Sequence, residues 1–261
     1  MKQGDFTQVA AHYHNRPAYS TMLLQKLVAC INDEYKPLQE LQVAEVGAGT
    51  GKLTALLGDM GLQVRAVEPN DAMREKGIEH TKSYANITWH KGSGEQSGLE
   101  SNSADWVIMA SSFHWTDPAK SLPEFARVLK TGGGGANGYF TAIWNPRNII
   151  EGSVFDEIER EIKHIVPELA RVSSGSQNVK KWEEILVSTG DFTDCFFMEC
   201  DYVETMDKAR YMGAWHSVND IQAQAGQDRW DKIIAMIESK IAHLSVIEVP
   251  YKIRAWSVRK A

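Results

Sequence analysis

Two acidic residues and a glycine-rich turn are the part of this sequence best suited to binding a ligand. Glu45 lies near the end of an apolar segment that runs into Gly47-Ala48-Gly49-Thr50-Gly51, and Glu68 closes the next apolar segment. Glycines in a turn between a strand and a helix let a ligand approach the backbone closely. A carboxylate at the position of Glu68 can accept hydrogen bonds from both hydroxyls of a ribose.

The spacing of the glycines and the acid before them restrict the kind of ligand. The turn reads G-x-G-x-G, whereas nicotinamide and flavin sites are typically marked by G-x-G-x-x-G. A carboxylate at Glu45 would repel a diphosphate but attract a sulfonium or ammonium group. The pattern therefore predicts a positively charged adenosine derivative and disfavours a nicotinamide oxidoreductase, which is the first alternative.

Strand-like and helix-like segments alternate from Leu41 onward, which indicates a parallel sheet covered by helices. We expect strands at Leu41–Val46, Gln63–Glu68, Asn86–His90, Asp105–Ala110, Tyr139–Trp144, Cys195–Val203 and Pro250–Val258. We expect helices at Tyr19–Tyr35, Thr50–Met60, Asp71–His80, Pro118–Leu129, Gly152–Val166, Lys180–Ser188, Lys208–Ala214 and Arg229–Leu244. In such a sheet, ligands bind where the carboxyl ends of the strands meet.

The composition suits one sizeable α/β domain or a core domain with a cap. The chain has 261 residues, of which 43% are hydrophobic, and a net charge of −6. This acidic balance, with no run of Lys or Arg, disfavours a nucleic-acid partner. The three cysteines have no metal-ligand spacing, and no apolar stretch is long enough to span a bilayer. We expect a cytoplasmic protein with no metal and no membrane association.

Four motifs together resemble a known family. They are V-A-E-V-G-A-G-T-G from Val43, V-R-A-V-E-P-N-D-A-M from Val64, A-D-W-V-I-M-A-S-S-F-H-W from Ala104 and F-A-R-V-L-K-T-G-G from Phe125. In this order they are similar to the class I S-adenosylmethionine (SAM)-dependent methyltransferases. The closest similarity is to the type 11 group of small-molecule enzymes, which includes trans-aconitate methyltransferase-like proteins. The resemblance covers about residues 5–150. One departure is Thr131, which replaces a proline in a loop over residues 130–138 that is longer than usual.

The resemblance implies a fold and a division of the chain. The fold is α/β, with a Rossmann-like sheet of seven mostly parallel strands, the last antiparallel, flanked by helices and a helical cap. Residues 1–40 would form an N-terminal helical lid and residues 41–144 the SAM-binding core. Residues 145–261 would form the cap or substrate region together with the last two strands.

The resemblance also implies the residues that bind SAM and its product, S-adenosylhomocysteine. Glu68 would hold the ribose, the loop after the third strand would contact the adenine, and Arg16 would pair with the methionine carboxylate. The full implied set is Tyr13, Arg16, Glu45, Gly47, Ala48, Gly49, Glu68, Pro69, Met73, Ser93, Gly94, Glu95, Ala110 and Ser111.

Methyl transfer from a sulfonium is an in-line displacement, so the protein mainly positions the acceptor and excludes water. A base is needed only where the acceptor must lose a proton. His114, just after the fourth strand, is the candidate for that base, or it only shapes the pocket. Arg147 would bind a carboxylate or phosphate of the acceptor, or would pair with an acid of the cap. The predicted substrate-lining residues are Phe113, His114, Trp115, Trp144, Arg147, Trp215 and His216.

The acceptor is expected to be a small molecule with an oxygen or nitrogen nucleophile, or a carboxylate. Two further alternatives keep the fold: a SAM-binding partner module without catalysis, and a methyltransferase acting on RNA or protein. A helical cap rich in tryptophan suits a small molecule better. A monomer and a homodimer both remain open.

Overall fold

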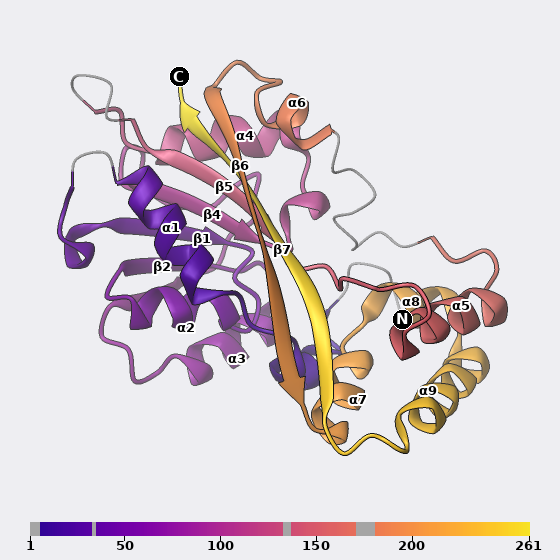
Figure 1. The fold of residues 1–261 in the computed structure, drawn as a ribbon. Helices are drawn as coiled ribbons and strands as arrows, with labels where there is room; N and C mark the ends of the chain where they lie inside the picture. The colour runs from indigo at the N-terminus through magenta and orange to yellow at the C-terminus, as the bar shows by residue number, and fades with distance from the viewer. Residues whose placement is uncertain (1–5, 33–34, 133–136, 171–180) are drawn as a thin grey trace. The chain divides into compact units, whose positions relative to one another are not determined.

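A seven-stranded sheet organises the chain. The computed structural model describes residues 6–32, 35–132, 137–170 and 181–261. The strand order is β3-β2-β1-β4-β5-β7-β6 (Figure 1). The pairs β1–β2, β1–β4, β2–β3 and β4–β5 are parallel, and β7 runs antiparallel to β5. The strands are β1 (Gln42–Val46), β2 (Gln63–Val67), β3 (Ile87–His90), β4 (Trp106–Ala110), β5 (Tyr139–Trp144), β6 (Phe192–Met206) and β7 (Ile247–Lys260). The predicted fold class is thereby confirmed.

The helices follow the expected order, with one addition. They are α1 (Thr21–Ile31), α2 (Lys52–Asp59), α3 (Asp71–His80), α4 (Pro118–Val128), α5 (Val154–Ile165), α6 (Trp182–Leu186), α7 (Lys208–His216), α8 (Asn219–Ala225) and α9 (Gln227–Ile241). Short 3₁₀ turns lie at η1 (Ala10–Asn15), η2 (Leu38–Glu40) and η3 (Phe113–Trp115). Helix α8 was not expected from the sequence. Part of the predicted long glycine loop, residues 133–136, lies outside the described residues.

The chain divides into two compact units. We call the described residues within 1–18, 146–174 and 201–252 the cap unit, and those within 19–145, 175–200 and 253–261 the sheet unit. Helix α1 therefore belongs with the sheet, whereas the sequence placed residues 1–40 in one lid. Strands β6 and β7 each run through both units.

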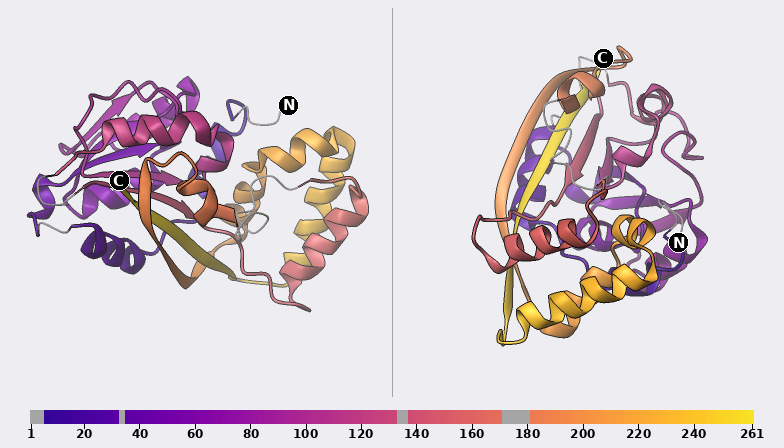
Figure 2. Two further views of the ribbon diagram at one scale, coloured as in Figure 1. Left: turned by 90° about the horizontal axis from the view of Figure 1, so that it is seen from above. Right: turned by 90° about the vertical axis from the view of Figure 1, so that its right-hand side faces the viewer.

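Alternating residues of the strands build the core of the sheet unit. Val107 and Met109 of β4 pack in one cluster with Leu122 and Phe125 of α4, whereas their neighbour Ile108 points to the other face of the sheet. Figure 2 shows α1 and α4 on opposite faces of the sheet. Because both faces are covered, β4 is a continuous apolar run, as is typical of a central parallel strand.

The cap unit has a separate apolar core. It gathers side chains from α5, α7, α8 and α9, including Phe155, Ile158, Tyr211, Trp215, Trp230 and Ile237. Among the helices that the structure describes, none combines the length and the apolar character needed to cross a membrane.

Candidate functional site

The glycine turn after β1 directs its amides inward. The N–H groups of Gly47 and Ala48 both donate to the Val67 carbonyl, at 2.8 and 3.0 Å. The N–H of Gly49 donates to Oε2 of Glu68 at 2.9 Å. A phosphate-binding turn needs such amides to point at its anion. This turn therefore lacks the features of a diphosphate site, in agreement with the ligand that the sequence predicted.

The residues that follow β4 lie so close to the turn that there is no room for a side chain at Gly47. Gly47 has a φ of +72°, and a Cβ there would lie 2.6 Å from Oγ of Ser112. Ser112 in turn donates to the Val46 carbonyl at 3.3 Å. Met73 of α3 lies on the other side of the turn, 3.4 Å from where a Cβ on Gly49 would stand. The carboxyl ends of β1 and β4 and the start of α3 therefore meet at one place.

Glu68 is fixed by the backbone on both of its oxygens. Oε2 accepts from Gly49 N and Oε1 accepts from Asn70 N, both at 2.9 Å. Burial raises the pKa of Glu68, although these two hydrogen bonds and Arg74 oppose the shift. A carboxylate has about four acceptor positions, so two remain for the hydroxyls of a ribose. The predicted role of Glu68 fits this geometry.

Glu45 lies deeper than the sequence suggested. Its side chain is 1% exposed, and its Oε2 accepts a 2.6 Å hydrogen bond from Oγ1 of Thr54. Burial raises the pKa of Glu45 to about 8, against the opposing hydrogen bond from Thr54 and with a smaller contribution from the charge of Glu68. Sequence reasoning treated Glu45 as a carboxylate. At neutral pH, in this structure, it is instead a protonated acid that a bound cation would ionise.

The loop after β3 is attached to the start of α4. Oε1 of Glu95 accepts from Asp117 N at 2.9 Å, and Oγ of Ser93 accepts from Gln96 N at 3.2 Å. A Cβ on Gly94 would lie 2.5 Å from the Thr116 side chain. These contacts fix the loop in place, and its predicted contact with adenine stays a prediction.

The end of β4 carries a conformational strain that often marks a functional site. Ser111, directly after Ala110, has a φ of +51°. Its N–H donates to the Ile143 carbonyl, and its Oγ lies 2.9 Å from the hydroxyl of Tyr19. Tyr19 was not among the predicted site residues. Its place in the segment Y-H-N-R-P-A-Y was the available signal.

His114 is held in one tautomer by a tryptophan. Its Nδ1 accepts a 3.1 Å hydrogen bond from Nε1 of Trp144. An indole N–H can only donate, so the neutral imidazole carries its proton on Nε2. The basic lone pair of the ring is therefore occupied, and the buried Nε2 carries the proton. This arrangement favours positioning of an acceptor over proton abstraction from it.

The aromatic residues around His114 divide into buried and exposed members. Trp144 is 2% exposed and stacks on Trp182 with 4.5 Å between ring centroids, and Phe113 packs on Phe140. Both rings are therefore part of the packing of the sheet unit, and their predicted role in substrate binding stays a prediction. Trp115 is 36% exposed and its ring lies 4.9 Å from that of His114.

Five predicted residues lie in the cap unit, namely Tyr13, Arg16, Arg147, Trp215 and His216. The Arg16 guanidinium lies 5.2 Å from the ring centre of Tyr13, and that of Arg147 lies 4.0 Å from the ring centre of Trp215. Arg147 also pairs with an acid of the cap, Glu159, which was one of its two predicted partners. The His216 ring lies near His12, at 5.4 Å.

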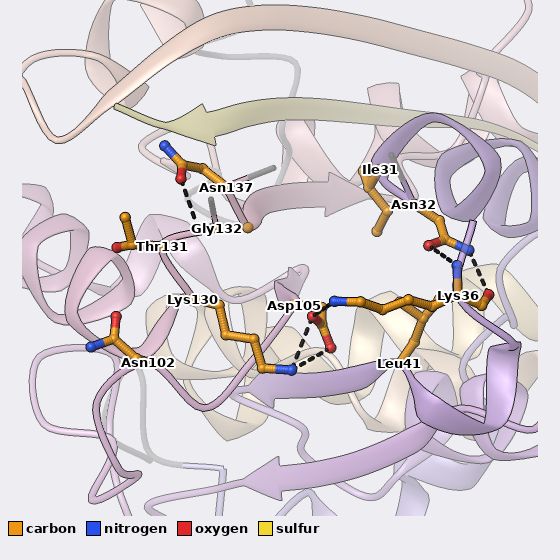
Figure 3. Close-up of a pocket in the computed structure, with 11 residues that line it drawn as sticks. Ile31, Asn32, Lys36, Leu41, Asn102, Asp105, Lys130, Thr131, Gly132 and Asn137 are labelled. Atoms are coloured by element: carbon orange, nitrogen blue, oxygen red, sulfur yellow. Dashed lines mark hydrogen bonds and ion pairs between the residues drawn. The ribbon is translucent and has the colours of Figure 1, made fainter. Parts of the chain in front are cut away.

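A pocket at the opposite edge of the sheet has a structural explanation. Figure 3 shows Lys36 and Lys130 directed at Asp105, which directly precedes β4. The two ammonium groups lie 3.0 and 2.9 Å from the carboxylate, which also accepts from Gln42 N. These ion pairs connect segments at the amino ends of β1 and β4. The glycine turn, Glu68 and Ser111, in contrast, follow the carboxyl ends of their strands.

Comparisons with known proteins agree with this geometry. Residues 44–135 match a family model described as a methyltransferase domain, of type 11. An uncharacterized methyltransferase of Mycobacterium tuberculosis is 34% identical over 143 residues, which are 54% of this chain and 51% of that protein. The chain therefore spans about half the length of the curated relatives that it matches.

Two solved structures share the fold. One, described as a type II methyltransferase of Anaeromyxobacter dehalogenans, gives a TM-score of 0.62 at 19% identity, over 94% of this chain and 97% of that one. The other is phosphoethanolamine N-methyltransferase 2 of Haemonchus contortus in complex with SAM, with a TM-score of 0.54 at 18% identity, over 99% and 58%. At these identities the likeness concerns the fold.

The buried acid gives a prediction for stability. Because the pKa of Glu45 is raised on folding, its contribution to stability is complete below about pH 4.5 and is lost as the pH rises toward 8. Glu45→Gln keeps a polar group of the same shape without a charge. From pH 5 to pH 9 the variant should therefore lose less unfolding free energy than the parent, by on the order of 2–4 kcal/mol.

Urea unfolding at the two pH values measures this difference. The matched control is Glu40→Gln, at an exposed position, and it should follow the parent. Equal losses in the Glu45 variant and the parent would show that Glu45 has an ordinary pKa.

Proposed function

We propose that the protein transfers a methyl group from SAM to a small-molecule acceptor, on the premise that residues 44–135 match the methyltransferase domain model. The observation that carries the proposal is the pair of buried acids, Glu45 and Glu68, beside a glycine turn whose amides face inward. Such a site offers hydrogen-bond acceptors and a latent negative charge, which suit the ribose and the positive charges of SAM.

The residues present fit this cofactor. Glu68 would accept the ribose hydroxyls with its remaining lone pairs, and Met73 and Pro69 would lie beside the adenine. Glu45 would ionise when a cation binds, because an opposite charge favours its carboxylate form. The roles of Tyr13 and Arg16, which lie in the cap unit, stay predictions of the resemblance.

When bound, SAM supplies an electrophilic methyl group, and the chain orients the acceptor and excludes water. We infer that His114 donates a hydrogen bond from Nε2 to the acceptor, because Trp144 occupies its other nitrogen. Trp115, the exposed aromatic residue beside it, would cover the acceptor. A base at His114 would require the bond to Trp144 to break first.

A small acceptor with an oxygen or nitrogen nucleophile is supported by two observations. The chain is acidic, with a net charge of −6, which disfavours RNA. One structural neighbour is named for a small amine, phosphoethanolamine. A SAM-binding partner module without catalysis remains the second candidate, and the strained Ser111 at the end of β4 favours the enzyme over it.

Substitution of Glu68 tests whether the protein binds SAM through its ribose. S-Adenosylhomocysteine should raise the Tm of the parent protein and NAD should not. Glu68→Ala should lose most of that rise, because two ribose hydrogen bonds to a charged group disappear, which corresponds to a loss of about tenfold or more in affinity. Differential scanning fluorimetry measures both shifts.

Glu95→Ala, in the neighbouring loop, is the comparison variant and should keep part of the rise. Stabilisation by NAD equal to that by S-adenosylhomocysteine would contradict the proposed cofactor. Binding of S-adenosylhomocysteine without methyl transfer to any small molecule would favour the partner module.

Substitution of His114 tests whether this residue donates a hydrogen bond to the acceptor or removes a proton from it. His114→Ala should keep S-adenosylhomocysteine binding and lower turnover by about tenfold to a hundredfold, whereas His114→Gln, which retains an N–H, should lose less. Turnover is followed from pH 6 to pH 9 as S-adenosylhomocysteine production with an acceptor found by screening. A rise in turnover near neutral pH that both variants abolish would identify His114 as a base.

A further inference from the structure

Trp182, the first residue of α6, contacts both the residue before His114 and the side chain that holds the His114 ring. Its indole stacks on Trp144 with 4.5 Å between ring centroids and an angle of 25° between the ring planes. The ring of Phe113 lies 5.6 Å from it. Trp182 is 4% exposed, and all four residues belong to the sheet unit. One buried side chain from a distant segment therefore packs on both supports of His114.

The stacked contact limits how the Trp144 indole can turn. The χ2 torsion of a tryptophan has broad energy minima, so packing decides where its Nε1 points. Trp144 has two aromatic neighbours besides Phe113 and His114, namely Trp182 on its face and Trp256 in a T-shaped contact at 73°. Of these two rings, Trp182 is the one that lies nearly parallel to the indole, and rotation about χ2 would drive the indole into it. Trp182 thereby keeps Nε1 within 3.1 Å of Nδ1 of His114.

What Trp182 supplies to this contact is its flat apolar face. Its Nε1 is buried and has no hydrogen-bond partner among the residues that the structure describes. A phenylalanine at this position would therefore lose no hydrogen bond that the structure shows. Both Trp144 and Trp182 lie outside residues 44–135, the part of the chain that the family model matches. The contact between them is thus a feature of the remaining part of the chain.

We propose that Trp182 is a positioning residue, which acts through Trp144 to keep the proton of His114 on Nε2. The tautomer of a neutral imidazole is set by the hydrogen bond that its other nitrogen makes. Without the stacked face the indole can turn away, Nδ1 loses its donor, and the lone pair of His114 becomes available as a base. The inference rests on the proposed role of His114 and adds the residue that decides between a donor and a base.

Nitrogen-15 NMR of the histidine rings tests the proposal in the protein alone. Spectra of histidine-labelled protein are recorded at pH 9, where an ordinary imidazole is neutral, and His114→Ala assigns the ring. The parent and Trp182→Phe should show a protonated Nε2 and a bare Nδ1, because a phenyl ring still stacks on Trp144. In Trp182→Leu the preference for this tautomer should fall roughly threefold to tenfold, as expected for the loss of one hydrogen bond.

Two further variants separate this effect from a loss of packing. Phe192→Leu shortens another buried aromatic side chain of the same core, one that packs on Phe140 rather than on Trp144. It should lower the Tm and leave the tautomer of His114 unchanged. Trp144→Phe removes the donor itself and should give the same mixture of tautomers as Trp182→Leu. Should the leucine variant fail to fold, Trp182→Met, which also lacks a flat face, is expected to show that mixture.

Three results would overturn the proposal. They are an unchanged tautomer in the folded leucine or methionine variant, an equal change in Phe192→Leu, and a parent protein that carries the proton on Nδ1. S-Adenosylhomocysteine should still raise the Tm of Trp182→Leu, and loss of this rise would show that Trp182 acts on the cofactor site instead of through Trp144. Absence of the rise in the parent would contradict the proposed function itself.

Discussion

Burial of two acids close to one turn, with only Arg74 among the described cations acting on Glu68, is the constraint on which the rest of the structure depends. Glu45 and Glu68 are 1% and 7% exposed, and burial raises the pKa of both. Such an arrangement costs stability in the free protein unless the groups stay protonated or gain partners. The backbone bonds to Glu68 and the hydroxyl of Thr54 on Glu45 supply part of that compensation. A positively charged nucleoside would supply the remainder.

The fold brings Glu45 and Glu68 together because the carboxyl ends of neighbouring strands meet at the glycine turn. Gly47 and Gly49 have positive φ values that let the turn close against Val67 and Glu68, and Ser112 of the β4 end fills the space that a side chain on Gly47 would need. In this closed turn the N–H groups of Gly47 and Ala48 donate to the Val67 carbonyl, and that of Gly49 donates to Glu68. Glycine-rich turns that bind phosphates direct their N–H groups at the ligand, whereas this turn leaves mainly the acceptors of Glu45 and Glu68 for a ligand.

Much of the fold could be predicted because local patterns determine it. Helix α3 and strand β5 have the predicted bounds. The apolar run of β5 marks that strand in the sequence, and Asn70, which was not singled out in the sequence, caps α3. Strand β6 was predicted too short, as Cys195–Val203 against Phe192–Met206, because its exposed alternation of polar residues resembles a loop. Helix α8 was missed because it is short and Val218 at its start gives no capping signal.

The sequence allowed the residue types of the candidate site to be predicted, but not the protonation of Glu45 or the tautomer of His114. The glycine turn and Glu68, the acid that is predicted to bind a ribose, could be identified from residue types and spacing. The protonation of Glu45 depends on burial and on Thr54, and the tautomer of His114 depends on Trp144, which is distant in sequence. Trp144 was expected to face an acceptor, but packing against Trp182 buries it. Tertiary contacts of this kind leave no mark in local periodicity.

The central claim is that Glu45 is a protonated acid which a bound cation ionises. Carbon-13 NMR titration of the glutamate carboxyl groups, with Glu45→Gln to assign the resonance, measures its pKa directly. A pKa near 8 in the free protein, lowered by SAM and less so by S-adenosylhomocysteine, which lacks the sulfonium charge, is the result expected. A pKa near the ordinary 4.5 in the free protein, or a raised pKa that SAM leaves unchanged, would contradict it.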